Sequence, residues 1–255
     1  MEEKALHFDI NFQIYDKVRP GYQNEIYETI SNYGEFTKIS NILEIGTGNG
    51  IASQEIYKKW SPKLTLIEPG KNLYDLLKSK FGNIKDIKIH NTTFENYQSE
   101  ILYDAIFSAT AFHWVDLSVK YKKSYEMLKN NGLLILYWNN YGIENVRVAE
   151  EIQKIYVKYG HGTNDSKSVY KLQLEKIEER KNEIQKSGYF EILEHKIVKY
   201  VKEYESNDYI HLLKTFSDHE KMEERFFEEI MSIIQNNENR IDVRIITNLE
   251  IAVKI

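Results

Sequence analysis

The stretch Asn41-Ile-Leu-Glu-Ile-Gly-Thr-Gly-Asn-Gly-Ile-Ala-Ser53 decides the fold of this chain. Its apolar run, residues 42–45, predicts a buried strand that ends at a glycine. Apolar residues then recur at helical spacing, which predicts that a helix begins near Gly50. A strand, a glycine-rich turn and a helix form the first unit of a nucleotide-binding α/β fold. Glycine suits the turn because it allows a tight bend and the close approach of a ligand.

The spacing of the glycines separates two classes of cofactor. A dinucleotide fold requires G-x-G-x-x-G to seat a pyrophosphate, whereas Gly46, Gly48 and Gly50 alternate here and follow an acid, Glu44. This pattern resembles motif I of class I S-adenosylmethionine (SAM)-dependent methyltransferases. SAM has an amino-acid end and no pyrophosphate, so a carboxylate near its ammonium group is chemically sensible. The alternative is a tight turn that joins a core strand to its helix and binds nothing.

A second acid ends the next predicted strand, which covers residues 63–67. Glu68 lies 22 residues after Gly46, close to the roughly 20 expected for an acid that holds ribose hydroxyls. A carboxylate suits that task because it accepts two hydrogen bonds from a vicinal diol. The alternative is an acid that stabilises the N-terminus of the following helix through the helix dipole.

Strands and helices continue to alternate up to residue 138. Residues 87–90, 103–109 and 133–138 predict three further strands. One helix is predicted before the first of them, over residues 73–81, and another before the last, over residues 121–128. This alternation predicts parallel strands joined by right-handed crossovers. Beyond it, residues 195–205 predict a sixth strand, and residues 241–246 and 249–254 predict a final strand or a hairpin.

The most specific match to a known family follows the fourth predicted strand. Residues 107–116 read F-S-A-T-A-F-H-W-V-D, which resembles the fourth-strand motif of small-molecule methyltransferases of the type 11 group, related to trans-aconitate methyltransferase. Residues 15–22 resemble the Y-D-x-x-R-P-x-Y segment that folds over the cofactor in that group, and residues 209–217 resemble its Y-I-x-L-L-x-T-x-S helix.

This resemblance implies that SAM is the cofactor and S-adenosylhomocysteine the product. It implies that Glu44 and the glycine turn place the methionine end, that Glu68 holds the ribose, and that the loop after the third strand borders the adenine. Many members have an acid at the start of that loop, where this chain has Asn91 and Thr92. The cofactor-binding residues expected in this way are Tyr15, Arg19, Glu44, Gly46, Thr47, Gly48, Asn49, Glu68, Pro69, Thr93, Phe94, Ser108, Ala109, His113 and Trp114.

His113 is the candidate catalytic base, because a base would deprotonate an oxygen or nitrogen nucleophile. The alternative is that His113 and Trp114 form a packed wall of the cofactor site. A carboxylate acceptor, as in trans-aconitate methyltransferase, needs no base. Arg19 is then the first cation to consider, unless it meets the cofactor's own carboxylate. Tyr15 is placed to favour the sulfonium by cation–π attraction, and no metal site is predicted.

We therefore expect one domain over residues 1–255: a Rossmann-like, seven-stranded, mostly parallel sheet flanked by helices. The resemblance implies that the last strand is antiparallel. The core covers about 34–138 and 190–255, and residues 1–33 form an N-terminal lid segment. Residues 139–190 depart from the strand–helix alternation and predict a helical cap inserted after the fifth strand. The alternative for this insertion is helical packing along the edge of the sheet.

The composition excludes several other classes of protein. The net charge of −5 and the absence of a basic block disfavour a partner bound through nucleic-acid phosphates. The chain has no cysteine, and so no disulfide, zinc–thiolate site or thiol nucleophile. No run approaches the ~18 apolar residues of a membrane span, and the charged first residues lack the apolar core of a signal peptide. We expect a cytoplasmic protein.

The sequence predicts methyl transfer to an oxygen or nitrogen of a small-molecule acceptor, with the oligomeric state left open. An NAD(P)-dependent oxidoreductase would need G-x-G-x-x-G after the first strand. A non-catalytic SAM-binding protein would keep the same motifs. A SAM-dependent nucleic-acid or protein methylase is a further alternative, although the N-P-P-Y string of amino-methylating DNA enzymes is absent.

Overall fold

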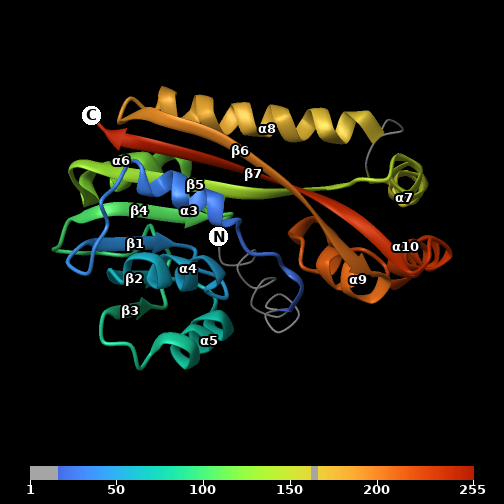
Figure 1. Ribbon diagram of the computed structural model, residues 1–255, viewed down its shortest axis with the longest axis horizontal. Coiled ribbons are helices and arrows are strands. Elements are labelled where there is room, and N and C mark those ends of the chain that lie inside the picture. The colour runs from blue at the N-terminus through green and yellow to red at the C-terminus, as the bar shows by residue number, and fades with distance from the viewer. Residues whose placement is uncertain (1–16, 162–165) are drawn as a thin grey trace.

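The chain forms one seven-stranded sheet in a computed structural model that describes residues 17–161 and 166–255. The strand order is β3-β2-β1-β4-β5-β7-β6 (Figure 1). The strands are β1 (Asn41–Ile45), β2 (Lys63–Ile67), β3 (Ile87–His90), β4 (Tyr103–Ala109), β5 (Leu128–Ile143), β6 (Phe190–Glu205) and β7 (Arg240–Lys254). The helices are α3 (Asn24–Ser31), α4 (Ile51–Trp60), α5 (Lys71–Phe81), α6 (Leu117–Met127), α7 (Val146–Lys158), α8 (Ser166–Lys186), α9 (Ser206–Lys214) and α10 (Glu224–Asn236), with short 3-10 turns at Phe112–Trp114 and Ser217–His219.

The pairing of the strands confirms the predicted fold class. Strands β1 to β5 pair in parallel, as strands joined by crossover helices must. Strand β7 runs antiparallel to both of its neighbours, β5 and β6. The predicted seven-stranded, mostly parallel sheet is therefore present, with the last strand of the chain inserted between β5 and β6.

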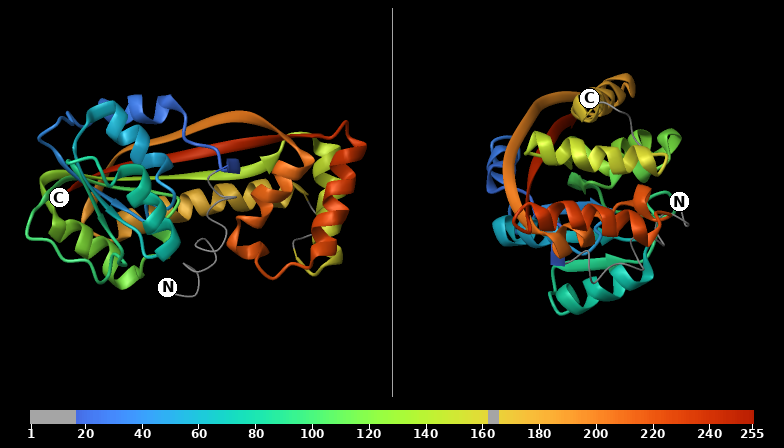
Figure 2. Two further views of the ribbon diagram at one scale, coloured as in Figure 1. Left: turned by 90° about the horizontal axis from the view of Figure 1, so that it is seen from below. Right: turned by 90° about the vertical axis from the view of Figure 1, so that its right-hand side faces the viewer.

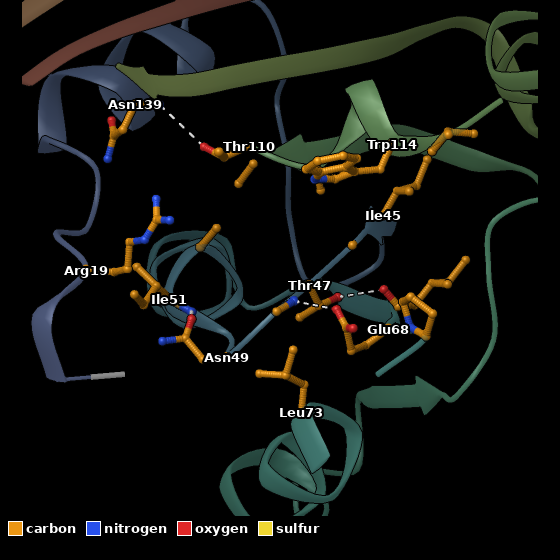
Figure 3. A pocket seen from close by; sticks show the side chains of 18 of the residues that line it. Arg19, Ile45, Thr47, Asn49, Ile51, Glu68, Leu73, Thr110, Trp114 and Asn139 are labelled. Carbon is orange, nitrogen blue, oxygen red and sulfur yellow. Dashed lines mark hydrogen bonds between the residues drawn. The ribbon is translucent and has the colours of Figure 1, made fainter. Parts of the chain in front are cut away.

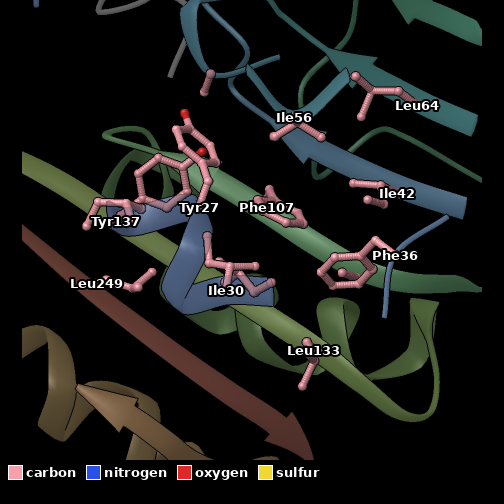
Figure 4. Close-up of a cluster of buried hydrophobic side chains, with 14 of the residues drawn as sticks. Tyr27, Ile30, Phe36, Ile42, Ile56, Leu64, Phe107, Leu133, Tyr137 and Leu249 are labelled. Atoms are coloured by element: carbon pink, nitrogen blue, oxygen red, sulfur yellow. The ribbon is translucent and has the colours of Figure 1, made fainter. Parts of the chain in front are cut away.

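Helices cover both faces of the sheet, and each face has its own apolar core. Helices α3, α4 and α5 pack on one face, where Tyr27, Phe107 and Tyr137 belong to a fully buried cluster (Figure 4). Helices α6 and α8 cover the opposite face. This two-sided cover explains why strands β1, β2 and β4 are almost continuous apolar runs.

Strands β5, β6 and β7 extend well beyond the nucleotide-binding part of the sheet. Each has 15 or 16 residues, and their far ends carry a third apolar cluster with α7, α9 and α10 (Figure 2). Strand β5 continues to Ile143, five residues past the predicted end at Trp138. The prediction stopped there because Asn139, Asn140 and Gly142 interrupt the apolar pattern, yet their backbone pairs with β7 throughout.

The two helices after β5 lie on different parts of the fold. Helix α7 packs against α10, whereas α8 runs along β5 and β6 (Figure 1). On the described part of α8, Gln173 donates a hydrogen bond to the Tyr141 carbonyl and Arg180 lies over the Trp138 ring. That residues 139–190 act as a cap on the ligand cleft stays a prediction.

Gly50, the last glycine of the turn, has no room for a side chain, and we expect its replacement to destabilise the fold. Its φ is +83°, and a Cβ would lie 2.6 Å from the buried Phe81 ring. Left-handed strain and overpacking together predict that Gly50→Ala lowers the free energy of unfolding by about 2–4 kcal/mol. Gly188→Ala is the matched control, because Gly188 also has a positive φ but nothing lies within 4 Å of its Cβ position. Urea unfolding should show a clearly smaller loss for the control, of about 1 kcal/mol; equal losses would contradict the packing argument.

Candidate functional site

A pocket lies at the carboxyl ends of the parallel strands, where open α/β sheets bind ligands. It encloses about 1140 Å³, counting the space that is open to solvent. The loops that follow β1, β2, β3 and β4 all contribute to its wall, together with the extended part of β5 and residues 19–22 near the N-terminus (Figure 3).

The first glycine of the turn brings two loops of this pocket together. Gly46 has a φ of +67°, and a Cβ on it would lie 2.4 Å from the Ala111 Cβ. The loop after β1 therefore touches the loop after β4 through a position that only glycine fills without displacement. The adjoining residues Thr47, Gly48 and Asn49 all border the pocket.

Glu68 joins the glycine turn to the loop after β2. Its Oε2 accepts a hydrogen bond from the Gly48 N–H, and its Oε1 accepts one from the Gly70 N–H, both at 2.8 Å. The side chain is buried and borders the pocket. Backbone N–H groups thus stabilise a buried charge, and the remaining lone pairs of the carboxylate can accept further hydrogen bonds.

Glu44 lies behind the pocket and is not one of its lining residues. It is buried, and its Oε2 accepts a hydrogen bond from the Ser53 hydroxyl at 2.5 Å, whereas its Oε1 is buried without a partner. Burial, opposed by the Ser53 hydrogen bond and assisted by the nearby Glu68 charge, raises the pKa of Glu44 to about 8. This upward shift of the pKa favours the protonated acid over the carboxylate that the sequence led us to expect.

His113 and Ser108 also lie outside the pocket lining. His113 is exposed, and its Nδ1 accepts a hydrogen bond from Trp138 Nε1 at 3.1 Å. Its ring lies 4.5 Å from that of Trp114, which does line the pocket. The Ser108 hydroxyl donates to the Ile45 carbonyl and so links β4 to β1. Nδ1 of His113 is therefore occupied, and a role as base would fall to Nε2.

Residues 18–22, which we call the N-terminal strap, are held by side chains from the far end of the sheet. The Tyr204 hydroxyl donates to the Val18 carbonyl, and the Tyr200 hydroxyl donates to the Gly21 carbonyl, both at 3.1 Å. Asn139 Nδ2 donates to the Gly21 carbonyl at 3.3 Å. The strap thus forms a wall of the pocket that depends on β5 and β6.

Arg19 fixes the strap to the C-terminal end of α9. Its Nε donates to the Thr215 hydroxyl at 2.8 Å and its Nη2 donates to the Thr215 carbonyl at 3.0 Å. The guanidinium lies 4.4 Å from the centre of the Phe216 ring. A cation at this position also interacts favourably with the C-terminal end of the helix dipole.

The pocket brings most of the expected residues together and adds others. The expected residues that line it are Arg19, Gly46, Thr47, Gly48, Asn49, Glu68, Pro69, Thr93, Phe94, Ala109 and Trp114. Tyr15 lies outside the described residues. The lining residues that the sequence did not indicate include Tyr22, Leu73, Thr110, Val115, Asn139 and Tyr141. Two of these had a weak signal in the sequence, because Tyr22 ends the Y-D-x-x-R-P-x-Y segment and Thr110 directly follows a strand. Asn139 and Tyr141 had none, because they belong to the unpredicted extension of β5.

Comparison with known families agrees with this geometry. Residues 43–136, from β1 to the middle of β5, match the family described as "Methyltransferase domain". This segment contains the glycine turn, Glu68 and the loops after β3 and β4. It is a class I SAM-dependent methyltransferase domain.

Curated relatives of this methyltransferase domain match only part of the chain. An uncharacterised methyltransferase of Schizosaccharomyces pombe is 28% identical over 132 residues, which is 52% of this chain and 52% of that protein. Malonyl-[acyl-carrier protein] O-methyltransferase 1 of Ilyobacter polytropus is 34% identical over 94 residues, 36% of this chain and 35% of that protein. The matched part spans about half the length, or less, of these relatives.

Solved structures share the fold of the whole chain at low sequence identity. A candidate type II methyltransferase from Anaeromyxobacter dehalogenans has a TM-score of 0.64 at 14% identity and covers 91% of this chain and 97% of that one. Phosphoethanolamine N-methyltransferase 2 of Haemonchus contortus, solved with S-adenosyl-L-methionine, has a TM-score of 0.54 at 15% identity. The match covers 96% of this chain and 57% of that one.

Within residues 17–161 and 166–255, every helix is too short or too polar to cross a membrane.

The raised pKa of Glu44 predicts a pH-dependent contribution to the stability of the methyltransferase domain. The unfolded chain loses this proton at about pH 4.3, whereas the native protein keeps it up to about pH 8. The native state therefore binds the extra proton in this window, and stability falls as pH rises through it. Glu44→Gln removes this loss, so its stability relative to the wild type should rise between pH 5 and pH 8, by an amount on the order of 3 kcal/mol.

Urea unfolding at several pH values measures this difference. Glu28→Gln, which replaces an exposed glutamate on α3, serves as the control and should follow the wild-type curve. Parallel curves for Glu44→Gln and the wild type would contradict a neutral Glu44.

Proposed function

We propose that this chain transfers the methyl group of SAM to a carboxylate oxygen of a small molecule. The observation that carries the proposal is the chemistry of the pocket wall. Among its described residues, Glu68 is the one carboxylate and Arg19 the one cation, and none is a histidine, lysine or cysteine. A pocket of this kind can place an acceptor that is already ionised. With Glu68 assigned to the ribose, the wall formed by the described residues has only Tyr22 and Tyr141 as further side chains that titrate as acids, and both are poor bases at pH 7.

The residues present fit SAM. Glu68 is a buried carboxylate at the pocket wall, a group that accepts hydrogen bonds and so suits the ribose hydroxyls. Leu73, Phe94 and Val115 provide an apolar slot for the adenine beside it. The open backbone at Gly48, where a Cβ would meet nothing within 4 Å, leaves room for the methionine end. Glu44 acts from behind this loop as a neutral acid, so we do not assign it an ion pair with the ammonium group.

Methyl transfer from SAM to a carboxylate depends on the alignment of the two reactants more than on proton transfer. SAM supplies a methyl group on a positively charged sulfur, which is already activated toward displacement. The acceptor oxygen forms a bond to the methyl carbon, and the electron pair of the carbon–sulfur bond passes to the sulfur. Positive and negative charge are consumed together, so a site that excludes water and aligns the two reactants accelerates the step. The strap and Trp114 enclose the pocket on the side where this alignment would occur.

Two relatives support oxygen as the atom that is methylated. The malonyl-[acyl-carrier protein] O-methyltransferases 1 and 2 of Ilyobacter polytropus are 34% and 32% identical to this chain over 94 and 79 residues. Arg19 supports an anionic acceptor, because its positively charged side chain borders the pocket.

Replacing Glu68 tests the cofactor assignment. Glu68→Gln places an amide N–H₂ against one of the two backbone N–H donors and removes the charge, so SAM and S-adenosylhomocysteine should bind at least tenfold more weakly. Calorimetric titration measures both affinities, with NAD(H) as a negative control and Asp75→Asn, an exposed change on α5, as the control variant. Unchanged SAM affinity in Glu68→Gln would remove Glu68 from the ribose site. Binding of NAD(H) alone by the wild type would favour an oxidoreductase.

The alkali stability of the product tests the acceptor class, whichever small molecule the acceptor is. The protein is incubated with methyl-labelled SAM and the low-mass fraction of a cell extract. Methyl esters of carboxylates hydrolyse in mild alkali and release the label as volatile methanol, whereas N-methyl and methyl ether products keep it. We expect most of the transferred label to become volatile. Alkali-stable label would contradict a carboxylate acceptor, and SAM binding without any transfer would favour a non-catalytic SAM-binding protein.

A further inference from the structure

Thr110 adopts a backbone conformation that threonine rarely takes. It follows β4 directly, and its φ is +56°. Ser61, Asn131, Glu238 and Asn239 are the other described non-glycine residues with positive φ, and none of these lines the pocket, whereas Thr110 does. A β-branched side chain is a genuine outlier in the left-handed region. Such strain at a ligand site supports a functional hypothesis when the side chain has a defined task there.

The hydroxyl of Thr110 is held from two directions. Its Oγ1 lies 2.8 Å from the Tyr22 hydroxyl of the strap and 3.4 Å from the Asn139 N–H of β5. The Thr110 N–H is already satisfied by the Tyr137 carbonyl at 2.8 Å. The left-handed conformation thus costs no backbone hydrogen bond, and it places the hydroxyl where the strap, β4 and β5 meet.

The direction of these hydrogen bonds leaves a proton on Thr110 for a ligand. A phenol is a much stronger acid than an aliphatic alcohol, so Tyr22 is the better donor of the pair. Thr110 Oγ1 then accepts from Tyr22 and from Asn139 with its two lone pairs. Its own O–H remains as a donor at the pocket wall.

Thr110 also lies on the appropriate side of the pocket. Figure 3 shows Thr110, Asn139 and Arg19 on the side opposite Leu73 and Glu68, which we assign to the nucleoside. An acceptor that meets the methyl group of SAM would therefore face the hydroxyl of Thr110 and the guanidinium of Arg19.

We propose that Thr110 binds the acceptor by donating its O–H to the carboxylate oxygen that does not react, which turns the other oxygen toward the methyl carbon. This inference rests on the proposed function and names the residue that orients the acceptor in that reaction. It explains why a β-branched residue occupies a position that glycine would fill without strain: glycine has no hydroxyl. Thr110 moves no proton in the transfer step.

Four substitutions at two positions separate this role from a structural one. Thr110→Ala removes the donor, Thr110→Ser keeps it, and Thr110→Gly removes both the donor and the strain. Tyr22→Phe breaks the same hydrogen bond between strap and β4 but keeps the Thr110 hydroxyl. Asn131→Ala changes a left-handed, exposed residue far from the pocket and is the control.

Each variant is assayed for the initial rate of alkali-labile label transfer at saturating SAM, for SAM affinity by calorimetry and for Tm. We expect Thr110→Ala to transfer about tenfold more slowly, as the loss of one hydrogen bond in the transition state predicts. Its SAM affinity should stay within twofold of the wild type, and Thr110→Ser should restore most of the rate. Tyr22→Phe should lose less than Thr110→Ala. Thr110→Gly should be as slow as Thr110→Ala, with a Tm about 2–4 °C higher than that variant.

Three outcomes would overturn the inference. A wild-type rate in Thr110→Ala would show that the hydroxyl does not orient the acceptor. A loss of SAM affinity in proportion to the loss of rate would make Thr110 a cofactor contact. Equal losses in Tyr22→Phe and Thr110→Ala would show that Thr110 only fastens the strap. Absence of transfer by the wild type is a different result, because it contradicts the proposed function itself.

Discussion

The pocket depends on the two hydrogen bonds that the Glu68 carboxylate accepts from backbone N–H groups. One comes from the glycine turn after β1 and the other from the start of α5, so a single side chain fixes two loops relative to each other. A buried charge is unfavourable unless it is compensated in this way. The alternating glycines have a second use here, since the turn must present the Gly48 N–H to Glu68 while Gly46 passes close to Ala111. The hydrogen bonds of Glu68 thus hold the loops after β1 and β2 together and place a carboxylate at the pocket wall.

The opposite wall of the pocket is built from parts of the chain that are far apart in sequence. The strap lies near the N-terminus, but its carbonyl groups are bound by Tyr200 and Tyr204 of β6 and its Arg19 is bound by Thr215 after α9. The long strands β5, β6 and β7 make this possible because they carry those residues beyond the nucleotide-binding half. The Glu68 side of the pocket therefore lies within residues 43–136, whereas the strap depends on Asn139 of β5, on β6 and on the residue after α9, which all lie beyond that segment.

The sequence predicted those features of the fold and the site that depend on residues close together along the chain. The strand, glycine turn and helix around Gly50 and the acid at the end of β2 were found because their chemistry depends on spacing along the chain. The raised pKa of Glu44 was missed because it depends on burial in the folded chain. The contact of His113 with Trp138 was missed because it joins the 3-10 turn after β4 to β5. Thr110 could not be singled out, since neither its left-handed backbone nor its neighbour Tyr22 is visible in sequence order. Long-range contacts decide which of the motif residues face the pocket.

The anchoring of the strap also constrains the order in which the protein can fold. Domains fold largely as they are synthesised, from the N-terminus onward, and the parallel strands up to β4 can associate early. The strap cannot reach its final place until β6 and α9 have left the ribosome, because its partners Tyr200, Tyr204 and Thr215 lie in the last quarter of the chain. Strand β7, between β5 and β6, arrives later still. The residues around Glu68 are therefore synthesised well before those that hold the strap, so the pocket can become complete only late in synthesis.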